Sequence, residues 1–327
     1  MLVAGGGTIV NVSSRGAFRG CGHMAGTRFE RALLSLEGLS LGDAFGESFF
    51  TADARERVHS RRLLEGPWRW TDDTAMAVSI VETLVACGTI DQHDLAARFA
   101  RRYGEEPGRG YGPATHRGLS EIRAGGGWRT VAAGQFSGQG SYGNGAAMRA
   151  SVVGAWFADD LDRAAAQARL SAEVTHTHPE GVAGAIGVAV AAALACRGGA
   201  CPLGSSYIEA VLDHLPACEL EARARAALVL GAEPAIERVV GVLGNGSHVS
   251  AQDTVPLVLW CASQHLNDYE RALWLTVSAL GDRDTTCAMV GGIVACRVGR
   301  TGLPAGWLAR RESLPCPGGI LDRPPRS

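Results

Sequence analysis

Apolar residues recur along most of the chain with the spacing of a helix. Between residues 72 and 87, Met76, Ile80 and Leu84 stand four positions apart, so they share one helical face, and Gly88 follows as a C-terminal cap. The alternation of apolar and polar residues that marks a half-buried strand is nearly absent. The pattern therefore predicts an all-α fold.

The same periodicity continues on both sides of this segment. Asp91 is a favourable N-cap for the next helical run, which ends at Gly104. The connections between runs are short and rich in glycine and proline, and no linker or internal repeat divides the chain. We expect about a dozen helices in a single domain. Further helical spacing covers residues 28–46, 162–176, 181–196, 206–215, 219–231, 254–264, 268–281 and 284–299.

The two ends of the chain do not continue the helical pattern. Residues 1–26 combine a glycine cluster, a short β-rich run and polar residues. We interpret them either as a poorly ordered extension or as the product of an upstream start codon, with the working protein beginning near Met24. The helical domain would then cover residues 27–314, and the proline-rich residues 315–327 would form a loose tail or an extended strap.

Composition and charge narrow the class of protein. The chain is 46% hydrophobic and 20% charged, which is typical of a soluble globular protein with a substantial core. Its net charge of −2 argues against a broad basic surface for nucleic acid or membrane. The most apolar run, residues 181–196, is shorter than the roughly 20 residues of a membrane span. The nine cysteines include no C-x-x-C pair, so we expect reduced thiols and a cytoplasmic location.

The stretch "WTDDTAMA" places two carboxylates just before an apolar helix. Asp72 and Asp73 are flanked by Thr71 and Thr74. Taken alone, the stretch is an ordinary helix start, because threonine is a good N-cap and carboxylates in a first turn are stabilised by the helix dipole. Its meaning depends on whether a partner stretch exists elsewhere in the chain.

The stretch "GDRDTTCAMVGG" provides such a partner. It offers Asp282, Asp284 and the hydroxyl of Thr285 before another apolar helix. Brought together, the two stretches would supply four carboxylates that repel one another unless they bind cations or take up protons. Mg²⁺, Mn²⁺ and Ca²⁺ prefer such oxygen ligands, and two adjacent ions could share a bridging carboxylate or water.

Two further stretches suggest a binding surface. In "FSGQGSYGNGAAMRA", glycines let the backbone approach a ligand, and amides at a helix start attract a phosphate. Phe136 and Tyr142 either stack on a base or only pack, and Asn144 either binds a sugar hydroxyl or adopts the left-handed conformation. In "SAEVTHTHPEG", which carries His176 and His178, one histidine is either a solvent-facing or satisfied loop residue or a contact to ribose or phosphate.

Together these stretches resemble the ADP-ribosylglycohydrolase family. The matching pieces, in order, are "GLSLGDAFG", "WTDDTAMA", "GSYGNGAAMR", "SAEVTHTHPEG", "TVPLVLW" and "GDRDTTCAMVGG". They cover residues 31–308, and the two acidic stretches together with the glycine loop form a specific joint signature. The resemblance implies an all-α orthogonal single domain that holds two Mg²⁺ or Mn²⁺ ions.

The resemblance also assigns roles to residues. The metal ligands would be Thr71, Asp72, Asp73, Asp282, Asp284 and Thr285. An aspartate at the cluster would be the catalytic base, with Asp43, Asp73 and Asp284 as candidates, and Asp43 would also hold waters beside the metals. The substrate would contact Phe136, Gly140, Ser141, Tyr142, Asn144 and His176.

The implied substrate is an ADP-ribosylated protein or another acceptor, joined to the C1″ carbon of the ADP-ribose. Hydrolysis of that glycosidic bond would pass through an oxocarbenium-like state stabilised by nearby carboxylates and would release ADP-ribose. A nucleic acid would be a partner only as a modified substrate. The sequence indicates neither the acceptor nor the oligomeric state.

The chain departs from the family pattern at three positions. Phe50 stands where many members carry a glutamate, and Glu47 lies three residues earlier. Pro113 replaces an aspartate of the arginine-directed bacterial members, and Arg283 replaces the usual threonine between Asp282 and Asp284. Two alternatives therefore stay open: an ADP-ribose-binding relative with weak or no catalysis, and a different metal-dependent hydrolase of a small nucleotide or sugar.

Overall fold

The computed structural model describes residues 27–231 and 234–315, and these residues confirm the all-α prediction. They form α-helices and four short 3₁₀ helices, and within these ranges the only β pairing consists of two isolated bridges, Trp68 with Arg311 and Gly143 with Ser250. The predicted extension, residues 1–26, lies outside the described residues, as does the tail after Pro315.

The described part of the chain contains sixteen α-helices, four more than the dozen expected. The helices are α1 Arg28–Glu47, α2 Ala54–Ser60, α3 Asp72–Cys87, α4 Gln92–Glu105, α5 Pro113–Arg123, α6 Trp128–Gly138, α7 Ser151–Trp156, α8 Leu161–Glu173, α9 Pro179–Ala195, α10 Ser205–Leu212, α11 Glu219–Ala226, α12 Ile236–Leu243, α13 Ala251–Gln264, α14 Tyr269–Ser278, α15 Arg283–Val298 and α16 Ala305–Leu308. The 3₁₀ helices are η1 Asn144–Ala146, η2 Gly198–Ala200, η3 Ala227–Val229 and η4 Arg300–Gly302.

Local signals place the ends of the well-predicted helices. Thr71 caps α3 by accepting a hydrogen bond from the backbone of Asp73, and Gly88 closes the helix with a positive φ. The side chain of Asp91 caps α4 in the same way. The helices that the pattern did not reveal, such as α2, α7 and α16, are too short to show a full hydrophobic period.

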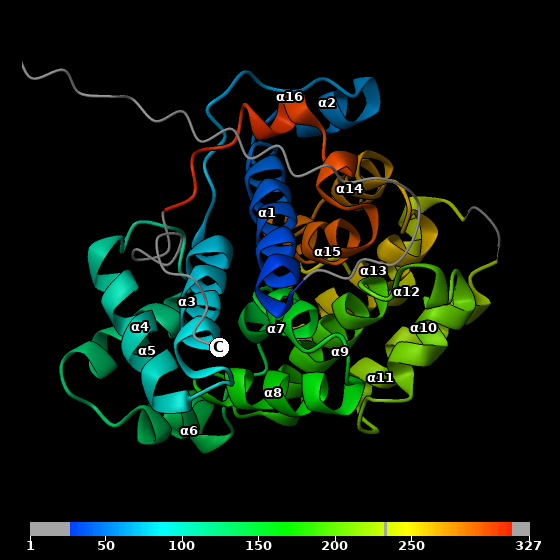
Figure 1. The fold of residues 1–327 in the computed structure, drawn as a ribbon. Helices are drawn as coiled ribbons and strands as arrows, with labels where there is room; N and C mark the ends of the chain where they lie inside the picture. Colours follow the sequence, from blue (N-terminus) through cyan, green and yellow to red (C-terminus); the bar gives the residue numbers. More distant parts are fainter. Residues whose placement is uncertain (1–26, 232–233, 316–327) are drawn as a thin grey trace, which may run out of the picture.

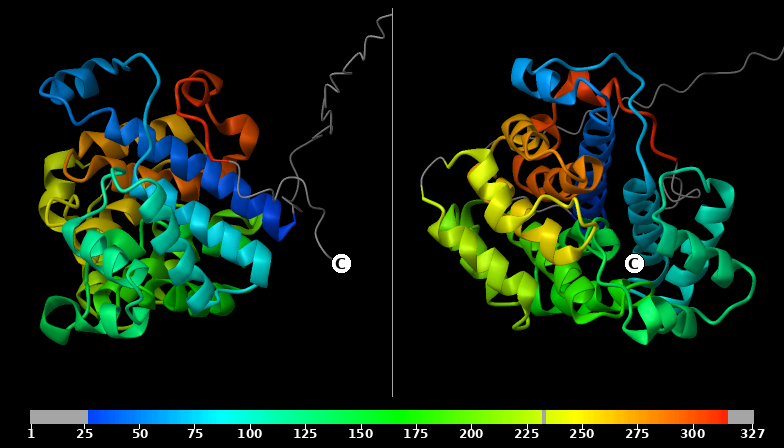
Figure 2. Two further views of the ribbon diagram at one scale, coloured as in Figure 1. Left: turned by 90° about the vertical axis from the view of Figure 1, so that its left-hand side faces the viewer. Right: turned by 180° about the vertical axis from the view of Figure 1, so that it is seen from behind.

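Helices α1 and α15 pack side by side along their lengths at the centre of the molecule (Figure 1). In that view α3 to α6 lie on one side of α1 and α10 to α14 lie on the other, with α7, α8 and α9 below. The two further views show the same central position of α1 (Figure 2). The core therefore joins segments from both ends of the sequence.

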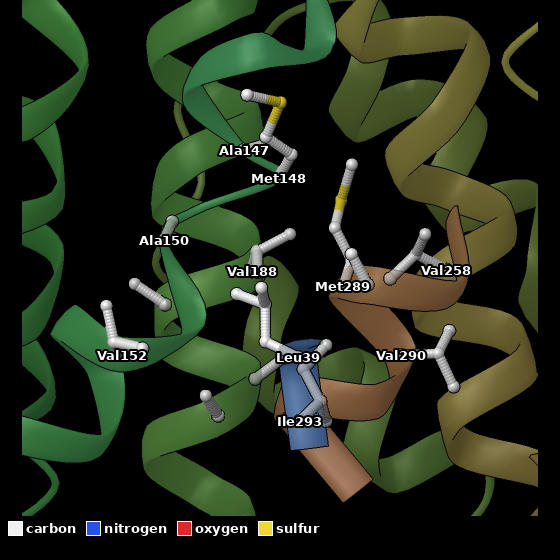
Figure 3. Packing of buried hydrophobic residues seen from close by; sticks show 14 of the residues in the cluster. Leu39, Ala147, Met148, Ala150, Val152, Val188, Val258, Met289, Val290 and Ile293 are labelled. Atoms are coloured by element: carbon white, nitrogen blue, oxygen red, sulfur yellow. The ribbon is translucent and has the colours of Figure 1, made fainter. Parts of the chain in front are cut away.

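The core is filled mainly by aliphatic side chains from these central helices. Leu39 of α1, Val188 of α9, and Met289 and Ile293 of α15 point into one shared cluster (Figure 3). All four are buried completely. Helix α9 is also buried almost throughout, as expected for a core helix of small residues, and no helix in the described ranges is long and apolar enough to cross a membrane.

Candidate active site

A close contact between α1 and α15 brings Asp43, the first aspartate of the chain, beside the second acidic stretch. A Cβ added at Gly42 would lie 2.7 Å from the carbonyl carbon of Cys287, and one at Gly46 would lie 2.8 Å from the Cα of Asp284. Only glycine allows the two backbones to approach this closely. The end of α1, which carries Asp43, thereby lies against the start of α15.

Asp43 anchors the start of α3 from its position on α1. Its carboxylate accepts hydrogen bonds from the backbone amides of Thr71, at 2.9 Å, and Thr74, at 3.1 Å. It also accepts from both threonine hydroxyls, at 2.9 and 2.5 Å. Asp43 is completely buried, so these bonds satisfy a carboxylate that has no access to water. The first acidic stretch is therefore fixed to α1 through Asp43.

The hydroxyl of Thr71 lies between two carboxylates. It is 2.9 Å from an oxygen of Asp43 and 3.0 Å from Oδ2 of Asp73. One hydroxyl proton can serve only one of these oxygens. The hydroxyl of Thr285, from the second acidic stretch, also approaches Oδ2 of Asp73, at 3.5 Å. The structure thus brings the two acidic stretches into direct contact.

Asp282 connects the second acidic stretch to the glycine-rich loop. Its Oδ2 accepts a hydrogen bond of 2.7 Å from the side-chain amide of Asn144, which also donates to Thr254 at 3.1 Å. The backbone amide of Asp282 donates to the carbonyl of Asn245 at 3.1 Å. Asn144 has a negative φ, so the left-handed interpretation of this residue is wrong.

Burial and mutual repulsion perturb the carboxyl groups of the cluster. Burial, with Asp284 adding to it, raises the pKa of Asp43 to about 7 against the hydrogen bonds from Thr74 and Thr71. Burial followed by the charge of Asp284 raises the pKa of Asp282 to about 8. Burial also raises the pKa values of Asp72 and Asp73 well above their usual range, with the other aspartates adding to the effect. The five aspartates therefore form one electrostatic unit.

Two oxygens of this unit lack any hydrogen-bond partner. Oδ1 of Asp73 and Oδ1 of Asp284 are buried, and no donor in the described residues reaches either of them. Such orphaned acceptors are rare in proteins because burying them without a partner costs free energy. Within the described ranges, no three His, Cys, Asp or Glu side chains already surround one point in the way a bound ion requires. A cation would therefore need small rotations of these carboxylates.

The glycine-rich loop passes next to this unit. Gly140 has a positive φ, and a Cβ there would collide with Thr177, so the position requires glycine. Ser141 is buried, and its hydroxyl accepts a hydrogen bond of 3.2 Å from the amide of Gly143. The loop then pairs with Ser250 through an isolated bridge and enters η1 at Asn144.

Two aromatic rings stand at the outer end of the loop. Phe136 and Tyr142 are 46% and 36% exposed, and their ring centroids lie 5.3 Å apart. Phe136 and Ser137 both have positive φ values, of 49° and 58°, which are unfavourable for residues other than glycine. Such strain often accompanies a binding site. The two exposed rings are close enough to contact one planar ligand.

The two histidines of "THTH" have different environments. The ring of His178 caps α9 by accepting a hydrogen bond from the amide of Glu180 at 3.2 Å, so it is a satisfied loop histidine. His176 is only 4% exposed and lies against the loop, 3.3 Å from a Cβ placed at Gly143. His176 therefore lies against Gly143 of the loop, whereas His178 caps α9 and contacts the ring of Tyr142, with ring centroids 5.5 Å apart.

The three departures from the family pattern differ in their relation to the acidic unit. Arg283 points away from it and donates a hydrogen bond of 2.7 Å to the carbonyl of Phe49. Burial raises the pKa of Glu47, and the charge of Asp284 raises it further, so Glu47 lies within electrostatic range of the unit. Pro113 is exposed and occupies the first position of α5, where proline is favourable.

Sequence reasoning missed several residues that hold this site together. Thr74 anchors Asp43, Thr254 supports Asn144, and the carbonyl of Asn245 positions Asp282. A buried arginine, Arg149, was also overlooked because its neighbours come from distant segments. The only local signal for it was its place within the "GNGAAMR" stretch.

The family model of the ADP-ribosylglycohydrolases matches residues 24–321. The chain belongs to the ADP-ribosylglycohydrolase family. It is therefore a hydrolase of the class that acts on the glycosidic bonds of ADP-ribose. This assignment agrees with the order of the acidic and glycine-rich stretches along the chain.

Other members of the ADP-ribosylglycohydrolase family align along most of the chain. ADP-ribosylhydrolase ARH3 of Bos taurus is 31% identical, over 94% of this chain and 92% of the relative. The ADP-ribosylarginine hydrolase Tri1 of Pseudomonas putida is 26% identical, over 86% of this chain and 74% of the relative. A solved structure described as an ADP-ribosylglycohydrolase-related protein complex superposes with a TM-score of 0.61 at 26% identity, covering 87% of this chain and 93% of its own.

Proposed function

We propose that the protein hydrolyses the C1″ glycosidic bond of ADP-ribose attached to a protein side chain or another acceptor, and that two Mg²⁺ or Mn²⁺ ions are its cofactors. The observation that carries the proposal is the convergence of buried aspartates from α1, α3 and the start of α15. Relatives named as ADP-ribosylhydrolase and ADP-ribosylarginine hydrolase support the same class of reaction.

The donor set fits divalent cations. Oδ1 of Asp73 and Oδ1 of Asp284 are buried acceptors without donors, and the hydroxyl of Thr71 cannot donate to both of its carboxylate neighbours. Hard cations with oxygen ligands would satisfy these groups and remove the repulsion among them. The proposed ligands are Thr71, Asp72, Asp73, Asp282, Asp284 and Thr285.

The aspartates of the site would have different roles in the reaction. When bound, the cations would orient the ribose hydroxyls and lower the pKa of an attacking water. Asp43 already accepts hydrogen bonds on both oxygens, so we assign it to positioning the first acidic stretch. Asp73 and Asp284 lie at the proposed cation site without the full set of hydrogen bonds that Asp43 accepts, so one of them would take the proton of the attacking water. The remaining carboxylates stabilise positive charge at C1″.

The glycine-rich loop would bind the rest of the ADP-ribose. The diphosphate would bind along the backbone from Gly140 to Asn144, where Tyr142 is exposed and Gly143 is partly exposed. His176 lies beside the same loop, and the exposed rings of Phe136 and Tyr142 would contact the adenine. The hydrogen bond from the side-chain amide of Asn144 to Asp282 connects the loop to the acidic unit.

A second candidate is an ADP-ribose-binding protein with weak or no catalysis. The observation that favours it is Phe50, an exposed aromatic ring at the position where the family resemblance implies a glutamate beside the scissile bond. This candidate predicts ADP-ribose binding without turnover.

A substrate panel separates the two candidates. The purified protein is incubated with Mg²⁺ or Mn²⁺ and with arginine, serine and nucleic-acid acceptors that carry ADP-ribose, and released ADP-ribose is measured. Release that disappears with EDTA and in Asp284→Asn supports hydrolysis. Asp162→Asn is the matched control, because Asp162 also lies in a first helical turn but its side chain is 94% exposed. Binding without release supports the second candidate, and absence of both rejects the two.

A further inference from the structure

A buried cation lies behind the glycine-rich loop without a carboxylate partner. Arg149 is completely buried, and in the described residues it forms no ion pair. Its guanidinium instead donates to the carbonyls of Gly145, at 3.0 Å, and Ser171, at 3.2 Å, and to the hydroxyl of Thr175, at 2.8 Å. A buried charge without an ion pair is costly, and here the three hydrogen bonds and the ring of Phe99, whose centroid lies 4.5 Å from the guanidinium carbon, stabilise it.

The bond to Thr175 determines the direction of the next hydrogen bond. A guanidinium only donates, so Oγ1 of Thr175 accepts from Arg149 and keeps its own proton free to donate. The other partner of this hydroxyl among the described residues is Nδ1 of His176, at 2.7 Å. The bonding is complete only when Nδ1 accepts that proton, because otherwise a buried O–H would have no acceptor.

The remaining ring nitrogen of His176 faces the loop. Nε2 is 3.3 Å from a Cβ placed at Gly143 and 3.1 Å from one placed at Gly145. No group in the described ranges forms a hydrogen bond with Nε2, although the side chain is almost completely buried. Burial and the charge of Arg149 lower the pKa of His176 to about 3, so the ring is neutral at physiological pH and carries one proton.

We propose that Arg149 and Thr175 are positioning residues that fix His176 in the tautomer protonated at Nε2, so that this N–H donates to an oxygen of the bound ligand. The inference rests on the proposed function in taking ADP-ribose as that ligand. Because Gly143 and Gly145 carry no side chains, the ring approaches the loop backbone closely, and a phosphate or ribose oxygen held along that backbone would accept the bond. Because the neutral ring is held in this tautomer, no binding free energy is spent on converting it from the other tautomer.

Nuclear magnetic resonance tests the tautomer directly. The full chain is labelled with ¹⁵N-histidine, and His176 is assigned by the signal missing from His176→Gln. We expect a protonated Nε2 and an accepting Nδ1 in the unmodified protein. Thr175→Val removes the hydroxyl while keeping the shape, so both tautomers should appear and ADP-ribose should bind about three- to tenfold more weakly, the loss of one net hydrogen bond. Thr175→Ser keeps the hydroxyl and should restore both properties.

Each result decides the inference. A protonated Nδ1 in the unmodified protein overturns it, as does an unchanged tautomer in Thr175→Val. If Thr175→Val does not fold, as judged by thermal unfolding, the spectrum of the unmodified protein decides alone. If the unmodified protein binds no ADP-ribose, the proposed function fails, whereas the tautomer of His176 is still read from the same spectra.

Discussion

The guanidinium carbon of Arg283 lies 4.6 Å from the centroid of the Phe50 ring. The two residues are two of the three departures from the family pattern, and the structure shows that they contact each other. The same guanidinium also donates to the carbonyl of Phe49, so Arg283 ties the segment after α1 to the start of α15. A change at one of these positions therefore affects the other.

This contact predicts how a glutamate at position 50 would behave. In Phe50→Glu, the new carboxylate would pair with Arg283 and gain little as a catalytic acid. In the double variant Phe50→Glu with Arg283→Thr, the carboxylate is free, and general acid catalysis should raise kcat by about 10²-fold on at least one ADP-ribosylated acceptor. ADP-ribose release is measured for each variant. Equal rates in the single and double variants would show that the pairing does not matter.

Because Gly46 lies so close to Asp284, adding one methyl group at Gly46 should lower the stability of the protein. Gly46→Ala places a Cβ 2.8 Å from the Cα of Asp284, so α1 and α15 must separate. We expect a loss of about 1–3 kcal/mol in the free energy of unfolding, measured by urea denaturation. Gly241→Ala, in α12, is the control, because its Cβ meets nothing within 4 Å. It should gain up to about 1 kcal/mol from helix propensity. Similar changes in both variants would contradict the close contact.

The raised pKa of Asp282 predicts a pH-dependent difference in stability. Burial and Asp284 raise this pKa from 3.8 to about 8 in the folded protein without metal. The folded state then binds the proton of Asp282 more tightly than the unfolded chain does. This proton stabilises the folded state fully below about pH 4, and the stabilisation is lost as the pH rises through 8.

The test compares the unmodified protein with Asp282→Asn, which cannot ionise. In EDTA, the Tm of the variant relative to the unmodified protein should rise between about pH 5 and about pH 8, because only the unmodified protein acquires the extra buried charge. Mg²⁺ should stabilise the unmodified protein at the higher pH and not the variant. A difference in Tm that is independent of pH would show that Asp282 is not perturbed in this way.

The exposed pair of aromatic rings predicts a loss of affinity specific to the base. Phe136→Ala should weaken ADP-ribose binding by about 1–3 kcal/mol, the usual contribution of one stacked base. AMP should lose as much, whereas ribose 5-phosphate should lose nothing, as measured by calorimetry. Val229→Ala is the control, because Val229 is an exposed apolar side chain outside the predicted binding residues. An equal loss for ribose 5-phosphate would place Phe136 away from the base.

The helical fold could be predicted because its signals are local. The hydrophobic period of α3 and its caps at Thr71 and Gly88 appear in the sequence and in the structure at the same residues. The six-residue helix α7 was missed because α1 and α9 bury all of its residues, so its sequence shows no alternation between an apolar and a polar face. The family and the class of reaction could also be predicted, because they depend on the order of several short stretches.

The arrangement of the site depends on contacts that the sequence does not display. The proximity of the two acidic stretches follows from glycines on α1 whose neighbours are backbone atoms of α15. Asn144 appeared to be a sugar contact or a turn residue, but its amide donates to Asp282. Nothing in the sequence distinguishes Arg149 from the other arginines, because its burial and its hydrogen-bond acceptors appear only in the folded structure. The assigned ligand and substrate roles remain predictions from the sequence.

The packing of α1 against α15 also determines when the site can form during synthesis. Asp43, Asp72 and Asp73 leave the ribosome early, whereas Asp282 and Asp284 follow near the end of the chain. A nascent chain therefore carries three of the five aspartates and lacks the repulsion from the other two. All five charges can come together only after the second acidic stretch has been synthesised, and bringing that stretch to α1 requires closing a long loop. Divalent cations available at that step would favour the completed chain over every shorter intermediate.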